Sequence, residues 1–124
     1  MKEEIKRWWD QANEDLAAAK DNLEIKRYNV AIFLCEQSVE KGLKTLHLEK
    51  FKTIPRIHDL TIFAKKFDMP DKLFSICEDL TNIYTETRYP DMSGQIPANR
   101  FSRKEAKEFI DGATEVILWI KNHL

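Results

Sequence analysis

The chain has 124 residues, 43% of them hydrophobic and 33% charged, which is the size and composition of one globular domain over residues 1–124. It has only 3 Gly and 4 Pro, which excludes the fibrous and low-complexity classes. Its 20 basic and 21 acidic side chains give a net charge of -1, which excludes a protein drawn to nucleic acid or membrane by its overall charge.

Apolar residues three and four positions apart predict two long helices in the first half of the chain. The second of them covers about 28 to 51 and is apolar over more than one face near its start, which predicts a central position. Gly42 in its middle is less favourable than Ala by roughly 1 kcal/mol, so we expect another helix to approach closely there. The first helix covers residues 3 to about 23, with an apolar stripe of Ile5, Trp8, Trp9, Ala12, Leu16, Ala19 and Leu23.

The second half of the chain is predicted to form one short helix and two long ones. The short helix covers 59–67, and the next helix covers about 71–87. Residues 89–101 have no periodicity and are expected to form a loop. The last helix begins after Ser102, which forms the sequence signature of a capping box with Glu105. Four long helices and one short helix in series predict an all-α, up-and-down bundle.

Motifs of the common enzyme and metal-binding classes are absent from the sequence. The chain has no phosphate-binding glycine loop and no zinc-protease motif, and its His and Cys residues lack metal-ligand spacing, so neither a metal nor a cofactor is expected. Cys35 and Cys77 lie among apolar residues and are predicted to be buried free thiols. No apolar run is long enough to span a membrane and residues 1–4 do not open a signal peptide, so we expect a cytoplasmic protein.

Arg88 lies near the end of the fourth predicted helix, and two interpretations of it are open. In the first, it complements the helix dipole and pairs with Glu86, Asp91 or a neighbouring helix. In the second, its guanidinium group is directed at a phosphate, with Tyr89 available for stacking.

Charge is unevenly distributed along the chain. Residues 41–66 carry 7 basic and 2 acidic side chains, whereas residues 67–95 carry 2 basic and 6 acidic ones. The basic segment is either a solvated lysine face or a contact for a partner or polyanion. Within it, His58 either joins Asp59 in capping the short helix or faces a cleft.

Some apolar residues lie off the main helical stripes. Trp8 and Trp9 are adjacent, so they cannot both face the same core, and Phe33 and Leu34 lie outside the stripe of the second helix. This surplus predicts a homodimer with Trp9, Phe33 and Leu34 in its interface, the alternative being a larger monomer core that takes them all.

Three stretches of the chain carry a family resemblance. They are residues 8–19, which read WWDQANEDLAAA, residues 28–44, which include AIFLCEQSVEKGLK, and residues 58–60 with the later segment 87–91, TRYPD. Together they resemble the HEPN family (higher eukaryotes and prokaryotes nucleotide-binding domain) over nearly the whole chain. The resemblance implies a helical bundle that commonly dimerises. It also implies a gene often adjacent to that of a minimal nucleotidyltransferase, in systems of the toxin–antitoxin type.

The resemblance also bears on catalysis. Many active members of the family are metal-independent ribonucleases that use an Arg and, after four to six intervening residues, a His, with two copies meeting at the dimer interface. Only Arg88 carries over, because the positions where the His would stand hold Ser93, Gly94 and Gln95. The missing imidazole argues against nuclease activity unless the fold brings His58 near Arg88.

The favoured hypothesis is a non-catalytic nucleotide- or nucleic-acid-binding or regulatory module that dimerises and pairs with a minimal nucleotidyltransferase. One alternative is a diverged metal-independent ribonuclease toxin, in which Arg88 holds the phosphate and His58 assists. A second alternative is a helical scaffold dimer without a ligand. The candidate residues for binding a nucleotide or phosphate are Arg88, Tyr89, Asp91 and Lys44.

Overall fold

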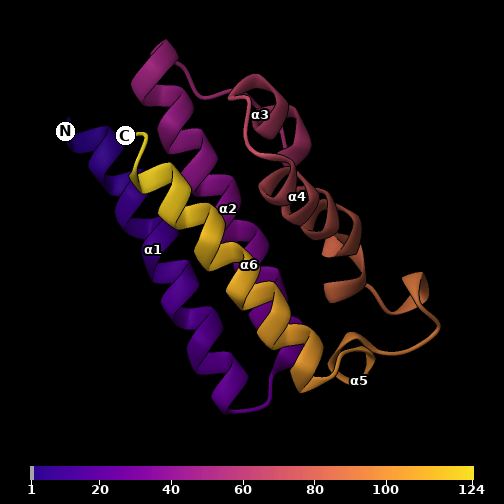
Figure 1. Ribbon diagram of the computed structural model, residues 1–124. Coiled ribbons are helices and arrows are strands. Elements are labelled where there is room, and N and C mark those ends of the chain that lie inside the picture. The colour runs from indigo at the N-terminus through magenta and orange to yellow at the C-terminus, as the bar shows by residue number, and fades with distance from the viewer. Residues whose placement is uncertain (1) are drawn as a thin grey trace.

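The computed structural model describes residues 2–124, and this part of the chain is helical, with no β-strand (Figure 1). The predicted all-α class is confirmed. In chain order the helices are α1 (Glu3–Glu24), α2 (Tyr28–Phe51), α3 (Leu60–Lys66), α4 (Asp71–Ile83), the 3-10 helices η1 (Tyr84–Thr87) and η2 (Pro90–Met92), α5 (Pro97–Arg100) and α6 (Arg103–Lys121).

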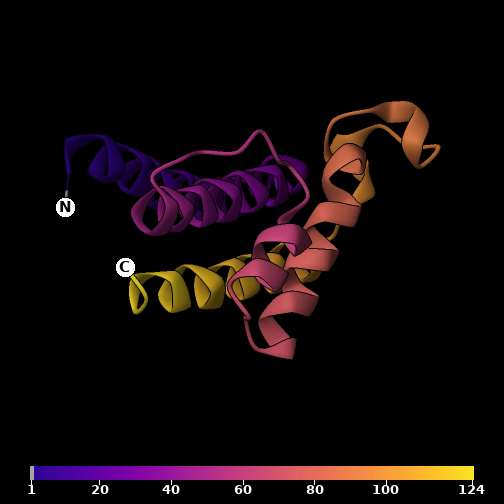
Figure 2. The same cartoon turned by 90° about the horizontal axis from the view of Figure 1, so that it is seen from above.

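The second helix, α2, lies at the centre of the fold, as its apolar pattern predicts. In Figures 1 and 2, α1, α2 and α6 run side by side, whereas α3 and α4 pack beside them at a steeper angle. The core between these helices includes side chains of α2 without any exposed surface, namely Ala31, Ile32, Cys35, Val39, Leu43 and Leu46. Both cysteines, Cys35 and Cys77, are buried free thiols, which confirms that prediction.

Gly42 marks the closest approach of α6 to α2. A Cβ atom at this position would lie 2.9 Å from Cδ1 of Ile117 and 3.0 Å from Cδ1 of Ile120. Both isoleucines belong to α6 and are buried in the core. The close helix contact expected at Gly42 is therefore present, and it offsets the low helix propensity of glycine.

The helix starts follow the predicted signals. Asp59 caps α3, because its Oδ1 accepts a hydrogen bond of 2.9 Å from the backbone N–H of Thr61. At the start of α6, the hydroxyl of Ser102 accepts from the backbone N–H of Glu105, whose carboxylate accepts from the backbone N–H of Ser102. The predicted capping box is therefore confirmed.

Two predictions about residues 71–101 need correction. The helix expected over 71–87 is α-helical only to Ile83 and then tightens into η1. The expected loop over 89–101 contains η2 and α5, each with a proline at its start, Pro90 and Pro97. Proline presets the backbone for a first helical turn, but a helix of one turn is too short to produce a periodic apolar pattern.

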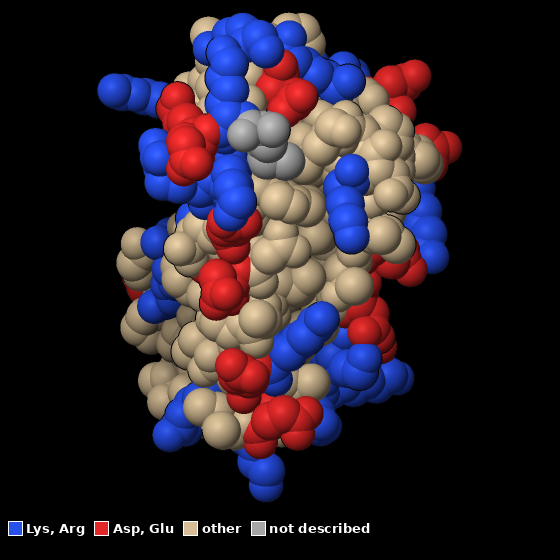
Figure 3. Space-filling model, turned by 90° about the vertical axis from the view of Figure 1, so that its left-hand side faces the viewer, with Lys and Arg blue, Asp and Glu red and all other residues tan. Residues whose placement is uncertain are grey.

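Charged side chains cover the outer surface of the bundle. On the side that carries α1, basic and acidic groups are interspersed, with Lys and Arg most frequent at its upper end (Figure 3). Two lysines of the basic segment 41–66 form internal ion pairs, Lys41 with Asp15 at 2.6 Å and Lys44 with Glu40 at 3.5 Å. Over the described residues, no helix has the length and apolar character that crossing a membrane requires.

Replacing Gly42 with Val is expected to lower the free energy of unfolding by about 2 kcal/mol or more, because the new side chain overlaps Ile117 and Ile120. The matched control is Ala17→Val on the exposed side of α1, for which helix propensity alone predicts a loss below about 1 kcal/mol. Urea unfolding followed by circular dichroism measures both. Equal losses for the two variants would contradict the close packing at Gly42.

Candidate functional site

A row of charged side chains lies along one buried face of α2. Glu36, Glu40 and Lys44 are four residues apart, so they lie one above another on the helix. They are only 2%, 8% and 7% exposed. Charged groups are rarely buried to this extent without partners, so the partners of these three residues define the chemistry of this face. Glu36 and Glu40 are called the carboxylate pair below.

Glu40 has the better-satisfied carboxylate of the pair. Its Oε1 lies 2.9 Å from Nδ1 of His58, and its Oε2 lies 3.5 Å from the ammonium group of Lys44. Opposite charge and hydrogen bonding both favour the ionised form of a carboxyl group. Glu40 therefore has groups in place that compensate its buried charge.

Glu36 is less well compensated. Its Oε2 accepts a hydrogen bond of 3.0 Å from the side-chain amide of Gln37, while the nearby Lys41 donates to an aspartate of α1 instead. Burial, with a smaller contribution from the charge of Glu40, raises the pKa of the Glu36 carboxyl to about 7, against the opposing effects of Gln37, His58 and Lys41. Burial thus favours the protonated form of Glu36 relative to an exposed glutamate.

His58 connects the carboxylate pair to solvent. Its side chain is 77% exposed, yet its Nδ1 faces the buried carboxylate of Glu40. In a neutral imidazole bonded in this way, Nδ1 carries the hydrogen and Nε2 remains an open acceptor. Of the two interpretations of the segment, Asp59 provides the helix cap and His58 is bound to Glu40.

Arg88 directly follows η1, and its side chain is exposed. Its guanidinium group lies over three aromatic rings, at 4.1, 4.9 and 5.8 Å from the ring centres of Tyr84, Tyr89 and Phe33. Within residues 2–124 no carboxylate pairs with Arg88, and Glu86 pairs with the arginine of α5 instead. The ion pairs considered in the first interpretation of Arg88 are thus not formed, and cation–π contacts hold the side chain.

The guanidinium group borders a groove of about 450 Å³ between the start of α2, the end of η1 and α5, which we call the Arg88 groove. The side-chain amide of Asn29 donates to the carbonyl of Thr87 at 3.2 Å and ties α2 to η1. Nε of Arg100 lies 3.5 Å from Oε1 of Glu86, and this ion pair holds α5 against η1. The groove is lined by Asn29, Val30, Phe33, Thr87, Arg88, Ile96, Pro97 and Ala98.

Tyr84 packs against two residues that line the groove, Phe33 and Arg88. Its ring stacks on that of Phe33, with centres 5.8 Å apart, and lies under Arg88. Burial raises the pKa of the Tyr84 hydroxyl, Glu36 and Glu40 raise it further, and Arg88 lowers it. Tyr84 therefore experiences the charges of both the carboxylate pair and Arg88, which makes them parts of one electrostatic environment. Arg88 and His58 themselves are not in hydrogen-bond contact.

The other predicted site residues lie in several settings. Tyr89 and Asp91 are exposed near Arg88 along the chain, whereas Lys44 is buried against Glu40 and does not line the Arg88 groove.

Of the residues predicted for a dimer interface, Trp9 and Leu34 are half-buried against the core, and Phe33 stacks on Tyr84 and lines the groove. The homodimer stays a prediction.

The carboxylate pair was not predicted from the sequence. The available signal is two glutamates four residues apart in a helix predicted to be central, where acidic residues are uncommon. Periodicity alone does not reveal this feature, because it does not show which polar positions of a central helix other elements cover.

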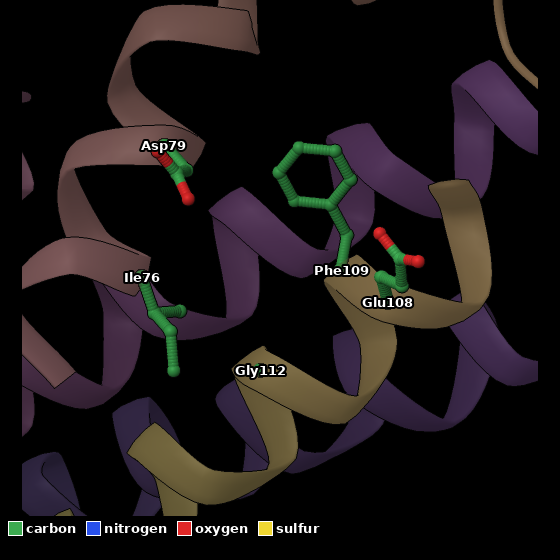
Figure 4. A pocket seen from close by; sticks show the side chains of 5 residues that line it. All are labelled: Ile76, Asp79, Glu108, Phe109 and Gly112. Carbon is green, nitrogen blue, oxygen red and sulfur yellow. The ribbon is translucent and has the colours of Figure 1, made fainter. Parts of the chain in front are cut away.

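A second, smaller hollow of about 110 Å³ lies between α4 and α6 (Figure 4). Gly112 allows Ile76 to approach α6, and the Phe109 ring lies between the carboxylates of Asp79 and Glu108. The described residues contain no cluster of His, Cys, Asp and Glu suited to a metal ion. The hollow shares no residue with the Arg88 groove and holds no group that pairs with a phosphate.

The substitution Glu36→Gln is expected to change how stability depends on pH. The folded-state pKa of Glu36 is raised from 4.5 to about 7. The contribution of this group to the free energy of unfolding is therefore most favourable below about pH 4.5, and that stability is lost as the pH rises through about 7. The variant stays neutral and should be more stable than the parent above pH 7, by roughly 1–3 kcal/mol. Urea unfolding across this pH range measures the difference, and parallel curves for the two proteins would contradict it.

Comparisons with known proteins agree with this architecture. The HEPN domain family model matches residues 5–123. The crystal structure of TT1696 from Thermus thermophilus is 30% identical in sequence, with a TM-score of 0.89, over 97% of this chain and 98% of that one. The crystal structure of ST0689, an archaeal HEPN homologue, is 28% identical, with a TM-score of 0.82, over 98% of both chains. No functionally curated protein matches the sequence. The chain belongs to the HEPN domain family.

Proposed function

We propose that this protein is a non-catalytic HEPN-type module that binds a nucleotide or single-stranded nucleic acid in the Arg88 groove. In this proposal it works as a homodimer and as the regulatory partner of a minimal nucleotidyltransferase, in a system of the toxin–antitoxin type. The observation that carries the binding function is the state of Arg88, whose guanidinium group is exposed, held over aromatic rings and free of any carboxylate partner within residues 2–124.

The surroundings of Arg88 suit a phosphate with an attached base. A guanidinium group offers several N–H donors in one plane and binds phosphate through paired hydrogen bonds. Tyr89 presents an exposed ring beside it, and Ile96 and Pro97 add an apolar wall to the groove. Stacking on an aromatic side chain contributes about 1–3 kcal/mol per base and tolerates any sequence.

The absence of acid–base groups from the groove favours binding over catalysis. The residues that line it include no His, Asp or Glu, and the positions that carry the histidine in active relatives hold Ser93, Gly94 and Gln95. Cleavage of a phosphodiester without metal requires groups that take up and release protons at the reacting atoms. A ligand held at Arg88 meets no such group from the groove lining.

Replacing Arg88 with Ala is expected to weaken binding of a short fluorescent single-stranded RNA by about tenfold or more, because a charge-assisted contact to phosphate is lost. Fluorescence anisotropy at fixed salt measures the dissociation constant. The control is Arg7→Ala, which removes an exposed arginine of α1 whose Nη1 lies 3.9 Å from Oε2 of Glu3 and which does not line the Arg88 groove. Unchanged binding by the Arg88 variant would overturn the proposal. RNA binding by neither parent nor variants would favour the ligand-free scaffold.

A diverged metal-independent ribonuclease is the second candidate, and the Glu40–His58 contact supports it. A buried carboxylate bonded to Nδ1 orients the imidazole and leaves Nε2 available to accept a proton. Arg88 would hold the phosphate while His58 removes the proton from a 2′-hydroxyl. The 2′-oxygen would then bond to the phosphorus and form a 2′,3′-cyclic phosphate, while the P–O5′ bond breaks and the leaving 5′-oxygen takes a proton from water.

The two candidates differ in one assay. Under the binding proposal, RNA incubated with the protein in a metal chelator stays intact. Under the ribonuclease hypothesis it is cleaved, His58→Ala and Arg88→Ala each reduce the rate by at least about a hundredfold, and an RNA with 2′-O-methyl groups resists. Gel analysis of end-labelled RNA measures the rate. Cleavage with this pattern would replace the binding proposal.

A further inference from the structure

We propose that ligand binding in the Arg88 groove is linked to protonation of the carboxylate pair, which begins about one helical turn after the groove residue Phe33 on α2, so that an anionic ligand binds more tightly as the pH falls through neutrality. The inference rests on the proposed binding function and adds to it a regulation by pH. Its basis is the burial of Glu36 and Glu40 together with the contacts of Phe33, Tyr84 and Arg88 at the groove.

The cluster contains more carboxylate than cation around Glu36. The charged and titratable groups facing Glu36 come from three elements: Glu40 and Lys41 from α2, His58 from the segment before α3, and Tyr84 from η1. Lys44 is engaged with Glu40, and Lys41 donates to Asp15 of α1 at 2.6 Å. The hydrogen bond that Glu36 accepts comes from a neutral amide, that of Gln37.

A carboxyl group in this setting gains and loses its proton near neutral pH. Burial and the neighbouring Glu40 both disfavour a second negative charge, and they set the pKa of Glu36 at about 7. The charge of Glu36 therefore changes over the physiological pH range, beside the carboxylate of Glu40.

Tyr84 carries the effect of this charge to the groove. Its ring lies 4.1 Å from the guanidinium carbon of Arg88, and the pKa of its hydroxyl is raised by Glu36 and Glu40 and lowered by Arg88. A negative charge on the pair lowers the electrostatic potential beside Arg88 and opposes an anionic ligand. Protonation removes that charge, so affinity for the anion rises at low pH.

His58 acts in the same direction but can be separated from Glu36 by experiment. Protonation of His58 adds positive charge beside Glu40, although its high exposure screens this charge. The His58 cation also lowers the pKa of Glu36. Replacing His58 is therefore expected to move the protonation of Glu36 to higher pH. Replacing Glu36 with a residue that does not ionise is expected to abolish the pH dependence of binding.

The test measures the dissociation constant of a short fluorescent 2′-O-methyl RNA from about pH 6 to about pH 8 at constant ionic strength, because phosphodiesters keep their charge over this range. The full-length parent is expected to bind about fivefold more tightly at the lower pH, with a midpoint near the pKa of about 7. Glu36→Gln should bind with the low-pH affinity throughout, and His58→Gln should keep the dependence with a higher midpoint. Glu14→Gln, an exposed carboxylate of α1, should behave as the parent.

The outcomes separate this inference from the proposed function. Binding that depends on Arg88 but is equal at all pH values in the parent overturns the inference and leaves the proposed function in place. Absence of RNA binding at every pH overturns both. A pH dependence that persists in Glu36→Gln overturns the assignment to the carboxylate pair. Carbon-13 NMR of the side-chain carboxyl of Glu36, without ligand, gives an independent check, and a titration below about pH 5 also overturns it.

Discussion

The burial of α2 along most of its length is the constraint on which the rest of this fold depends. A helix enclosed by α1, α6 and the α3–α4 unit can keep polar side chains only where a partner reaches them. Most of them are satisfied in this way. The hydroxyl of Ser38 donates to the carbonyl of Ala12 at 2.7 Å, and His47 uses both ring nitrogens, donating from Nδ1 to the carbonyl of Thr53 and accepting at Nε2 from Lys66. His47 therefore fixes the end of α2 to the following segment.

The carboxylate pair is where this constraint is met least completely, and its position gives it consequences. A buried charged residue that only fills space in a protein core can often be replaced by an apolar side chain of similar volume without loss of stability. Glu36 instead keeps a group with a pKa of about 7 inside the bundle, about one helical turn from Phe33, whose ring lies under Arg88 together with that of Tyr84. Under the proposed pH linkage, the stability that this burial costs at neutral pH accompanies a change in the electrostatic potential of the groove.

The long helices were predictable from the sequence because their signals are local. The bounds of α2, the capping box at Ser102 and the close approach at Gly42 all depend on periodicity, on the chemistry of helix ends or on the propensity of one residue. The site depends on contacts between distant segments. Arg88 rests on a ring contributed by Phe33, and Glu40 meets His58 from beyond the end of its helix. Neither pairing leaves a trace in spacing along the chain, so the sequence identified Arg88 and His58 but not what joins them.

The spacing of their contacts along α2 bears on what Arg88 and His58 do together. Arg88 is held at Phe33 and His58 at Glu40, which are separated by two helical turns, or about 10 Å along the axis. General acid–base catalysis requires both groups at one reacting phosphate, within hydrogen-bond reach. The ribonuclease hypothesis therefore requires the Arg88 and His58 side chains, anchored two helical turns apart on α2, to meet at one phosphate, whereas the binding proposal places no such requirement on His58.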